Sequence, residues 1–248
     1  MKLTKNKIYF ASDFHLGSPN LEESQKREKL IVNWLTEIEK DANAIYLVGD
    51  IFDFWFEYKK VIPKGFVRLL GKLAELTDNG VVIHLFVGNH DLWMNDYLEK
   101  EVGMIIHHKP IIVNEQNKQI FIAHGDGLGK GDYFYKFIRK IFSSRICQFF
   151  FSCLHPNLAF YLAHKWSQKS RKVNETPFKS KDNEILYGYA KEKQEENPVD
   201  YYVFGHRHIP LELNVNNSKA VYINLGEWIS HNSYAELKDG EISLKYYR

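Results

Sequence analysis

The stretch Ala44-Ile45-Tyr46-Leu47-Val48-Gly49-Asp50 reads as a buried strand that ends abruptly at a glycine and a carboxylate. A short, continuous apolar run of this kind is typical of a strand that is covered on both faces. Two similar runs lie on either side of it, at Lys7–Ser12 and Val81–Val87. Helical periodicity fills the two gaps, over Glu22–Lys40 and Lys64–Thr77. This strand–helix–strand–helix–strand order predicts a largely parallel sheet in an α/β fold.

The second half of the chain adds shorter strands and three more helical stretches. The expected strands are Ile111–Val113, Gln119–Ala123, Asp200–Phe204, Pro210–Leu213, Ala220–Ile223 and Ser233–Lys245. The helical patterns cover Asp132–Leu154, Pro156–Arg171 and Asp182–Glu195. No repeat or low-complexity linker interrupts this order. We therefore expect one domain over 1–248 that carries a helical insertion at about 128–172.

Charge is distributed unevenly in a chain of otherwise ordinary composition. The 248 residues are 44% hydrophobic and 26% charged, as in a typical globular domain. Residues 133–174 hold eight Lys or Arg residues, eleven aromatic residues and no Asp or Glu, whereas the remainder has 25 basic against 31 acidic residues. This basic, aromatic segment predicts a surface for an anionic or amphiphilic partner.

The sequence also predicts a cellular location. No apolar run reaches 18 residues, and the apolar run after the N-terminal lysines is too short for a secretory signal. Cys147 and Cys153 match no metal or redox spacing, so they read as reduced thiols. We therefore expect a cytoplasmic protein that does not span a membrane.

Candidate metal ligands follow the predicted strands, at the point where each strand ends. They are Asp13, His15, Asp50, Asn89, His124, His206 and His208. Since the carboxyl ends of strands in an α/β sheet meet at one rim, we expect these side chains to lie together. An extended backbone would point both members of Asp13-x-His15, and of His206-x-His208, the same way. Oxygen and imidazole ligands suit divalent metals such as Mn²⁺, so the pattern predicts a metal site rather than unrelated turn and cap residues.

These residues form an ordered series of motifs from Asp13 to His208: Asp-x-His, Gly-Asp-x-x-Asp, Gly-Asn-His-Asp, His-Gly-Asp and Gly-His-x-His. In this series the chain resembles the calcineurin-like metallophosphoesterases. The resemblance implies a four-layer α/β/β/α sandwich and two divalent metal ions, with Mn²⁺ expected. One ion would be held by Asp13, His15, Asp50 and His208. The second would be held by Asp50, Asn89, His124 and His206, with Asp50 shared.

The resemblance also implies roles for residues beside the metals. A two-metal centre activates a water between the ions and neutralises charge on the phosphoryl oxygens. Asn89 would face a phosphate oxygen, and His90 would stabilise the transition state or protonate the leaving oxygen, with Asp91 orienting it. Asp53 is expected to hydrogen-bond a metal ligand. His84 is expected to pack within its strand, and His107 and His108 are expected to be exposed loop residues. The other histidines outside the motifs are expected at the surface or in packing: His155, His164 and His231.

Three segments make the resemblance more specific, because they match one family within this class: Ser12–Gly17, Gly49–Trp55 and His124–Gly127. They are similar to those of the UDP-2,3-diacylglucosamine pyrophosphohydrolases of lipid A biosynthesis. That family releases UMP and 2,3-diacylglucosamine 1-phosphate, usually with Mn²⁺, at the cytoplasmic face of the bacterial inner membrane. The insertion occupies the position of the family's helical lid, and Gly-Asn-His-Asp here replaces the Gly-Asn-Arg-Asp of its best-known branch. We expect phosphate and sugar contacts from the polar end of the lid, at Lys165, Ser167, Lys169, Ser170 and Arg171.

An apolar stripe runs along the first half of the insertion at three- and four-residue spacing. It consists of Phe134, Phe137, Ile138, Ile141, Ile146, Phe149 and Phe150. Such a stripe is typical of a helix packed on a core. With basic residues between its members, it also predicts a groove for acyl chains and peripheral association with an anionic membrane.

Three other functions stay open. A soluble phosphodiesterase or nucleotide pyrophosphatase would share the metals and use the insertion for packing. A nuclease would bind backbone phosphates with the basic segment. A non-catalytic scaffold is the third, and the complete ligand set argues against it. An acylated UDP-sugar is the preferred partner, and no nucleic acid is expected.

Overall fold

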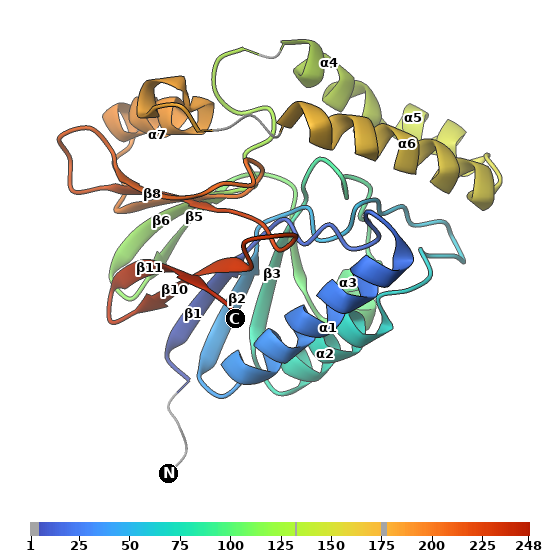
Figure 1. Ribbon diagram of the computed structural model, residues 1–248, viewed down its shortest axis with the longest axis horizontal. Helices are drawn as coiled ribbons and strands as arrows, with labels where there is room; N and C mark the ends of the chain where they lie inside the picture. The colour runs from blue at the N-terminus through green and yellow to red at the C-terminus, as the bar shows by residue number, and fades with distance from the viewer. Residues whose placement is uncertain (1–4, 132, 175–177) are drawn as a thin grey trace.

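The computed structural model describes residues 5–131, 133–174 and 178–248, apart from the side chains of residue 134 and residues 168–174. A six-stranded sheet in the order β11-β10-β1-β2-β3-β4 forms one half of the molecule (Figure 1). Its strands are β1 (Lys7–Ala11), β2 (Ala42–Leu47), β3 (Val82–Phe86), β4 (Ile105–His107), β10 (Ser233–Lys238) and β11 (Glu241–Tyr246). Strands β1 to β4 pair in parallel, as the strand–helix alternation predicts.

A five-stranded sheet in the order β5-β6-β7-β9-β8 forms the other half. Its strands are β5 (Ile111–Glu115), β6 (Lys118–Ala123), β7 (Tyr201–Phe204), β8 (Pro210–Asn214) and β9 (Val221–Leu225). The three central strands β6, β7 and β9 are parallel, and both edge strands are antiparallel to their neighbours. The carboxyl ends of the central strands therefore lie at one edge of each sheet, and residues that follow strands of both sheets, such as Asp50 and His124, meet at a common rim.

Helices cover the outer faces of the two sheets. The six-stranded sheet carries α1 (Leu21–Ile38), α2 (Val67–Asp78) and α3 (Tyr97–Val102). The five-stranded sheet carries α7 (Ile185–Glu196), which follows a short 3₁₀ turn at Lys181–Asn183. The N-terminus of α1 is capped by the Asn20 side chain, which accepts a hydrogen bond of 3.0 Å from Glu23 N.

Three separate hydrophobic cores define the layers. Tyr9 and Ala11 of β1 face the helices and pack with residues such as Trp34. Ile8 and Phe10, which alternate with them, face the second sheet. A third core lies between the five-stranded sheet and α7. Because each core separates two layers, the structure confirms the predicted four-layer α/β/β/α sandwich.

Some local predictions differ from the structure. The predicted helix Asp132–Leu154, whose first residue lies outside the described ones, is two helices from Tyr133 on, since Ser144 caps a new helix by accepting a hydrogen bond of 3.2 Å from Cys147 N. The segment Ser233–Lys245 is a hairpin, β10 and β11, rather than one strand. The short elements α3 and β4 were not predicted. His107 was expected in a loop but is the last residue of β4. Its Nε2 lies 2.9 Å from Nδ1 of His84, which packs within β3 as predicted.

The insertion forms a lid of three helices above the rim: α4 (Tyr133–Phe142), α5 (Arg145–Ser152) and α6 (Pro156–Asn174). In Figure 1 these helices lie over the ends of the strands, beside α7. Polar contacts attach α4 to the core. The buried Asp126 carboxylate accepts hydrogen bonds from Arg139 Nε and, at 2.8 Å, from the Tyr135 hydroxyl. Trp93 Nε1 donates to Phe142 O at 2.7 Å.

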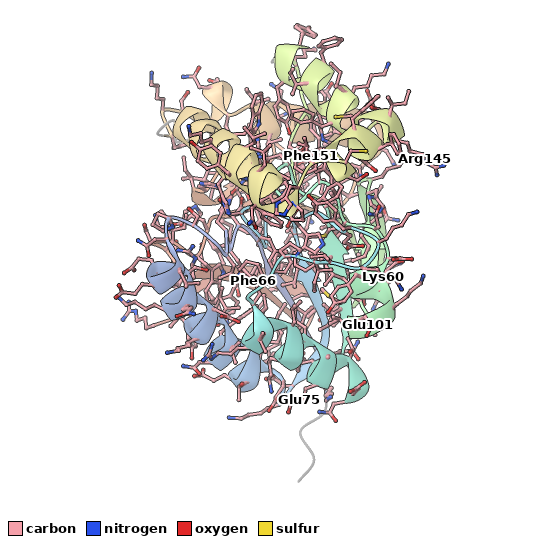
Figure 2. All side chains as sticks on the ribbon, turned by 90° about the vertical axis from the view of Figure 1, so that its right-hand side faces the viewer. Lys60, Phe66, Glu75, Glu101, Arg145 and Phe151 are labelled. Carbon is pink, nitrogen blue, oxygen red and sulfur yellow. The ribbon has the colours of Figure 1, made fainter. Side chains whose placement is uncertain are left out.

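Aromatic side chains attach the rest of the lid. The ring of Phe151 lies 4.5 Å from that of Trp93, 4.9 Å from that of Phe56 and 5.9 Å from that of Phe54. Figure 2 shows Phe151 at the junction between the lid helices and the core, with Arg145 on the outer side of the lid. The inner surface of the lid is therefore packed on the loops that follow β2 and β3.

Candidate metal centre

Left-handed backbone conformations bend the chain around the site. Five of the seven predicted ligands have positive φ: Asp13 (55°), His15 (45°), Asp50 (53°), His206 (69°) and His208 (55°). Non-glycine residues rarely adopt this conformation, which costs of order 1–3 kcal/mol each, so the surrounding structure must enforce it. The expectation of an extended backbone at Asp13-x-His15 and His206-x-His208 is therefore wrong. Tight turns, rather than strand alternation, aim these side chains inward.

Backbone hydrogen bonds between neighbouring loops enforce these turns. Asp13 N donates to Gly49 O, and His15 N donates to Asp50 O, both at 3.0 Å. In the other sheet Gly205 N donates to His124 O at 3.0 Å. These bonds connect ligand loops of adjacent strands, so the protein backbone itself fixes the positions of the ligands.

Glycines allow the ligands to approach the neighbouring backbone. A Cβ at Gly88 would lie 2.2 Å from Asp50 Oδ1 and 2.5 Å from Asp50 N. A Cβ at Gly205 would lie 2.6 Å from Asp13 Oδ2. Real Cβ atoms do not come this close, so any side chain at either position would displace a ligand. The glycines of the Gly-Asn-His-Asp and Gly-His-x-His motifs are therefore steric requirements of the site.

One group of ligand atoms comes from Asp13, His15 and His208, all within 4.8 Å of one another. Asp13 Oδ1 lies 3.2 Å from His208 Nε2 and 3.7 Å from His15 Nε2. The two Nε2 atoms are 2.9 Å apart. A carboxylate and two imidazoles that converge in this way are a suitable donor set for a borderline divalent cation.

A second group comes from Asp50, His124 and His206, again within 4.8 Å of one another. Asn89 completes it, because its Oδ1 lies 2.9 Å from His206 Nδ1 and 3.2 Å from His124 Nε2. His124 Nδ1 lies 2.8 Å from Val48 O, which can only accept a hydrogen bond. That contact places the proton on Nδ1 and leaves Nε2 as the metal-binding atom.

Asp50 lies between the two groups. Its Oδ2 is 3.4 Å from His124 Nε2 and 3.9 Å from His15 Nε2. Its other oxygen, Oδ1, accepts a hydrogen bond of 2.9 Å from His90 N and is thereby held in place. One carboxylate oxygen therefore faces both clusters, as a shared ligand would.

The charge states of Asp50, Asp13 and His206 suit metal binding, whereas at His124 burial is outweighed by the Asp50 carboxylate, which raises the pKa of the imidazole well above its usual value. Burial opposes ionisation of Asp50, but His124, His90 and His15 outweigh it and hold the pKa of its carboxyl well below the usual range. The same balance, with His15 and His208 as neighbours, keeps the pKa of Asp13 far below its usual value. Burial lowers the pKa of His206 to about 4, so this imidazole is neutral at pH 7. Carboxylate and neutral imidazole are the forms that bind a metal.

The environment of Asp13 gives a further reason to expect a metal ion at this site. Asp13 Oδ1 is buried and accepts no hydrogen bond, although two imidazole nitrogens lie within 3.7 Å of it. A buried carboxylate oxygen without a partner is costly, and a cation between it and the imidazoles would remove that cost. Behind this group, Asp53 Oδ1 lies 3.7 Å from His15 Nδ1, in the place expected for a residue that supports a ligand.

His90 lies beside the ligand groups, but its neighbours differ from those expected. Its Nε2 is 4.0 Å from Asp50 Oδ2, and its Nδ1 is 2.9 Å from Ser167 Oγ. Asp91, expected to orient His90, instead accepts hydrogen bonds from the backbone N–H groups of Gly88, Ile51 and Phe52. The buried Asp91 carboxylate therefore ties the loops after β2 and β3 together, and the orienting contacts to His90 come from elsewhere.

The predicted substrate contacts on the lid lie in different surroundings. Lys165 is exposed, with Nζ 4.6 Å from the centre of the Tyr161 ring. Ser167 is buried against His90. The side chains of Lys169, Ser170 and Arg171 lie outside the described residues.

Two residues beside the centre were missed by the sequence reasoning. His164, expected in a surface or packing role, has Nδ1 3.6 Å from Asp53 Oδ2. Asp126 anchors α4, although no role was predicted for it. The His-Gly-Asp motif marked Asp126, but a lone helical histidine such as His164 carries no local signal.

Known proteins are similar to this chain over most of its length. A family model described as calcineurin-like phosphoesterase matches residues 6–210. UDP-2,3-diacylglucosamine hydrolase of Porphyromonas gingivalis is 40% identical over 246 residues, which cover 93% of this chain and 94% of that protein. Proteins of the same name from Pseudomonas fluorescens and Haemophilus influenzae are each 28% identical, over 89% of this chain and 88% and 90% of their own lengths.

Proposed function

The chain belongs to the calcineurin-like phosphoesterase family, and on that premise we propose that it hydrolyses UDP-2,3-diacylglucosamine to UMP and 2,3-diacylglucosamine 1-phosphate. The observation that carries this proposal is the 40% identity to a hydrolase of that name over 93% of the chain. The convergence of the motif residues at one rim supports it, because it supplies the donor atoms that metal-dependent phosphoester hydrolysis needs.

The proposed cofactor is a pair of divalent cations, with Mn²⁺ expected. Each ligand group would hold one cation, and Asp50 would be a ligand of both. When bound, such ions supply Lewis acidity and an activated water. Asn89 directs its Oδ1 toward His124 and His206, which leaves its amide Nδ2 to donate to a phosphoryl oxygen. His90 Nε2, 4.0 Å from the shared carboxylate, is placed to donate a proton or hydrogen bond to a reacting oxygen.

The outer face of the lid supports an amphiphilic partner. Phe137, Ile146, Phe149 and Phe150 are each more than 60% exposed, and Arg145 is exposed beside them. A surface that combines large apolar groups with positive charge favours anionic lipid. Among the described residues, no helix has the length and hydropathy needed to cross a bilayer. We propose that the protein associates peripherally with the cytoplasmic face of the bacterial inner membrane.

An assay of UMP release tests the proposed activity. Purified protein loaded with Mn²⁺ is expected to release UMP from UDP-2,3-diacylglucosamine, and excess chelator is expected to abolish the release until Mn²⁺ is restored. UDP-N-acetylglucosamine, which lacks the long acyl chains, is the matched control and is expected to react far more slowly. Equal rates on both substrates would favour a nucleotide pyrophosphatase without lipid specificity. Full turnover in chelator, with metal absence verified by elemental analysis, would rule out the metal-dependent mechanism.

A further inference from the structure

One face of the lid helix α6 is seated on the metal rim. Phe160, His164 and Ser167 are spaced four and three residues apart, so they lie on the same side of the helix. The Phe160 ring packs edge-on against Phe54 at 5.3 Å. Tyr161 and Trp166 are more than half exposed. The helix therefore presents Phe160, His164 and Ser167 to the rim, whereas Tyr161 and Trp166 lie on its outer side.

Ser167 contacts His90, the candidate catalytic side chain beside the two ligand groups. Its Oγ lies 2.9 Å from His90 Nδ1, and Ser167 is only 4% exposed. Asp53 O lies 3.3 Å from the same nitrogen. The other ring nitrogen, Nε2, faces Asp50 at 4.0 Å. The two nitrogens of His90 therefore have different surroundings: Nδ1 contacts the lid, and Nε2 faces the ligand groups.

His164 extends the same contact surface. Its Nδ1 lies 3.6 Å from Asp53 Oδ2, and Asp53 Oδ1 lies 3.7 Å from His15 Nδ1. A single face of α6 therefore meets both the ring of His90 and the carboxylate that lies behind His15. Movement of α6 away from the rim would remove both contacts at once.

We propose that Ser167 is a positioning residue that holds the His90 ring and thereby couples the seating of the lid to catalysis. This role differs from a direct substrate contact because it acts through the ring of His90, whose Nδ1 lies 2.9 Å from the Ser167 hydroxyl. It deepens the proposed function and rests on it only for the identity of the substrate. A substrate that seats the lid would then also complete the reactive site, whereas a lid held open would leave His90 without this partner.

A double-mutant cycle in the Mn²⁺-loaded enzyme tests the proposal. Ser167→Ala is expected to lower kcat about tenfold, the scale of one hydrogen bond to a reacting group, and to leave KM within about twofold. Ser167→Thr keeps the hydroxyl and is expected to recover most of the rate. In a His90→Ala background, Ser167→Ala is expected to cause no further loss, because its effect passes through His90. Ser152→Ala, at an exposed lid serine, is the matched control.

The opposite pattern would overturn the proposal. If Ser167 contacted the substrate directly, Ser167→Ala would raise KM. It would also lower kcat/KM by the same factor in the His90→Ala background as in the unchanged protein. An unchanged kcat in Ser167→Ala would also contradict the positioning role. Metal content, measured by elemental analysis, is expected to be equal in all variants, which separates a positioning effect from loss of a ligand.

A readout without substrate separates this proposal from the proposed function. In protein loaded with diamagnetic Zn²⁺, the ¹⁵N resonance of His90 Nδ1, assigned by its absence in His90→Ala, is expected to shift in Ser167→Ala and not in Ser152→Ala. An unchanged resonance would refute the Ser167 contact even if UMP release is observed. A shifted resonance without UMP release would retain the contact and reject the substrate.

Discussion

The rim and the lid place their functional residues in opposite ways. At the rim, Asp13, His15 and Asp50 are at most 1% exposed, and backbone hydrogen bonds between loops hold them in left-handed conformations. On the lid, Phe149 and Phe150 are 64% and 66% exposed. A site for chemistry must be fixed before the substrate arrives, whereas a surface for acyl chains or membrane must leave apolar groups uncovered. On the proposed function, the rim would supply reactivity and the lid would supply selection.

Removal of the shared charge at the rim is expected to have the largest effect. Asp50→Asn keeps the shape of the side chain but removes the carboxylate that faces both ligand groups. We expect kcat/KM to fall by roughly 10³-fold or more, the scale of a dominant electrostatic contribution. His84→Gln, in β3 and outside the motifs, is the control and is expected to retain metal content and activity. Equal behaviour of the two folded variants would refute the ligand assignment.

His90→Ala probes reactivity separately from metal binding. Its Nε2 lies beside the centre, but its removal takes no atom from either ligand group. We expect kcat to fall about 10²-fold, within the range of general acid catalysis, while elemental analysis shows an unchanged metal content. Loss of one metal equivalent would instead make His90 a ligand.

A smaller effect is expected from a methyl group added behind a ligand. In Gly88→Ala the new Cβ would overlap Asp50 Oδ1 and Asp50 N, so the shared ligand must move. We expect a fall in kcat of about tenfold to 10²-fold, because small displacements of catalytic groups are costly. Gly71→Ala, in α2 with no atom within 4 Å of its new Cβ, is the matched control.

The control variant is expected to keep full activity and to gain roughly 0.5–1 kcal/mol of unfolding free energy, measured by denaturant titration. Similar kinetic losses in Gly88→Ala and Gly71→Ala would show that the close approach at the rim is not required.

Substitution of exposed apolar residues on the lid is expected to have the smallest effect on catalysis but a clear effect on membrane binding. The double variant Phe149→Ser, Phe150→Ser removes two exposed rings from α5, and we expect severalfold weaker sedimentation with vesicles that contain phosphatidylglycerol. The matched control is Val82→Ser with Ile105→Ser, two apolar residues that are 43% and 45% exposed and begin β3 and β4, at the opposite end of these strands from the rim and the lid. Equal vesicle binding by both double variants would contradict the membrane proposal.

The rim could be predicted from the sequence because its information is local. Each ligand lies in a loop that follows a strand, and each strand is a short apolar run, so residues such as Asp50 and Asn89 were placed correctly at the sheet edge. The backbone conformation was not predicted, because left-handed turns at Asp13 and His206 depend on hydrogen bonds to loops that are distant in sequence.

The lid was predicted less completely because its roles depend on docking. Periodicity identified helices, but it could not show that Ser144 begins a new helix or which face of α6 meets the rim. His164 and Ser167 differ from their helical neighbours only in orientation toward the core. Likewise, Asp91 was assigned to His90 by adjacency, whereas its carboxylate bonds the backbone of loops around residues 51 and 88.

The most direct test of the account is Mn²⁺ anomalous scattering from crystals of the metal-loaded protein. We predict two peaks at the rim, one among Asp13, His15 and His208 and the other among Asn89, His124 and His206. Both peaks are expected within bonding distance of Asp50. A single peak, or two peaks that do not share Asp50, would contradict the shared two-metal centre on which the proposed chemistry depends.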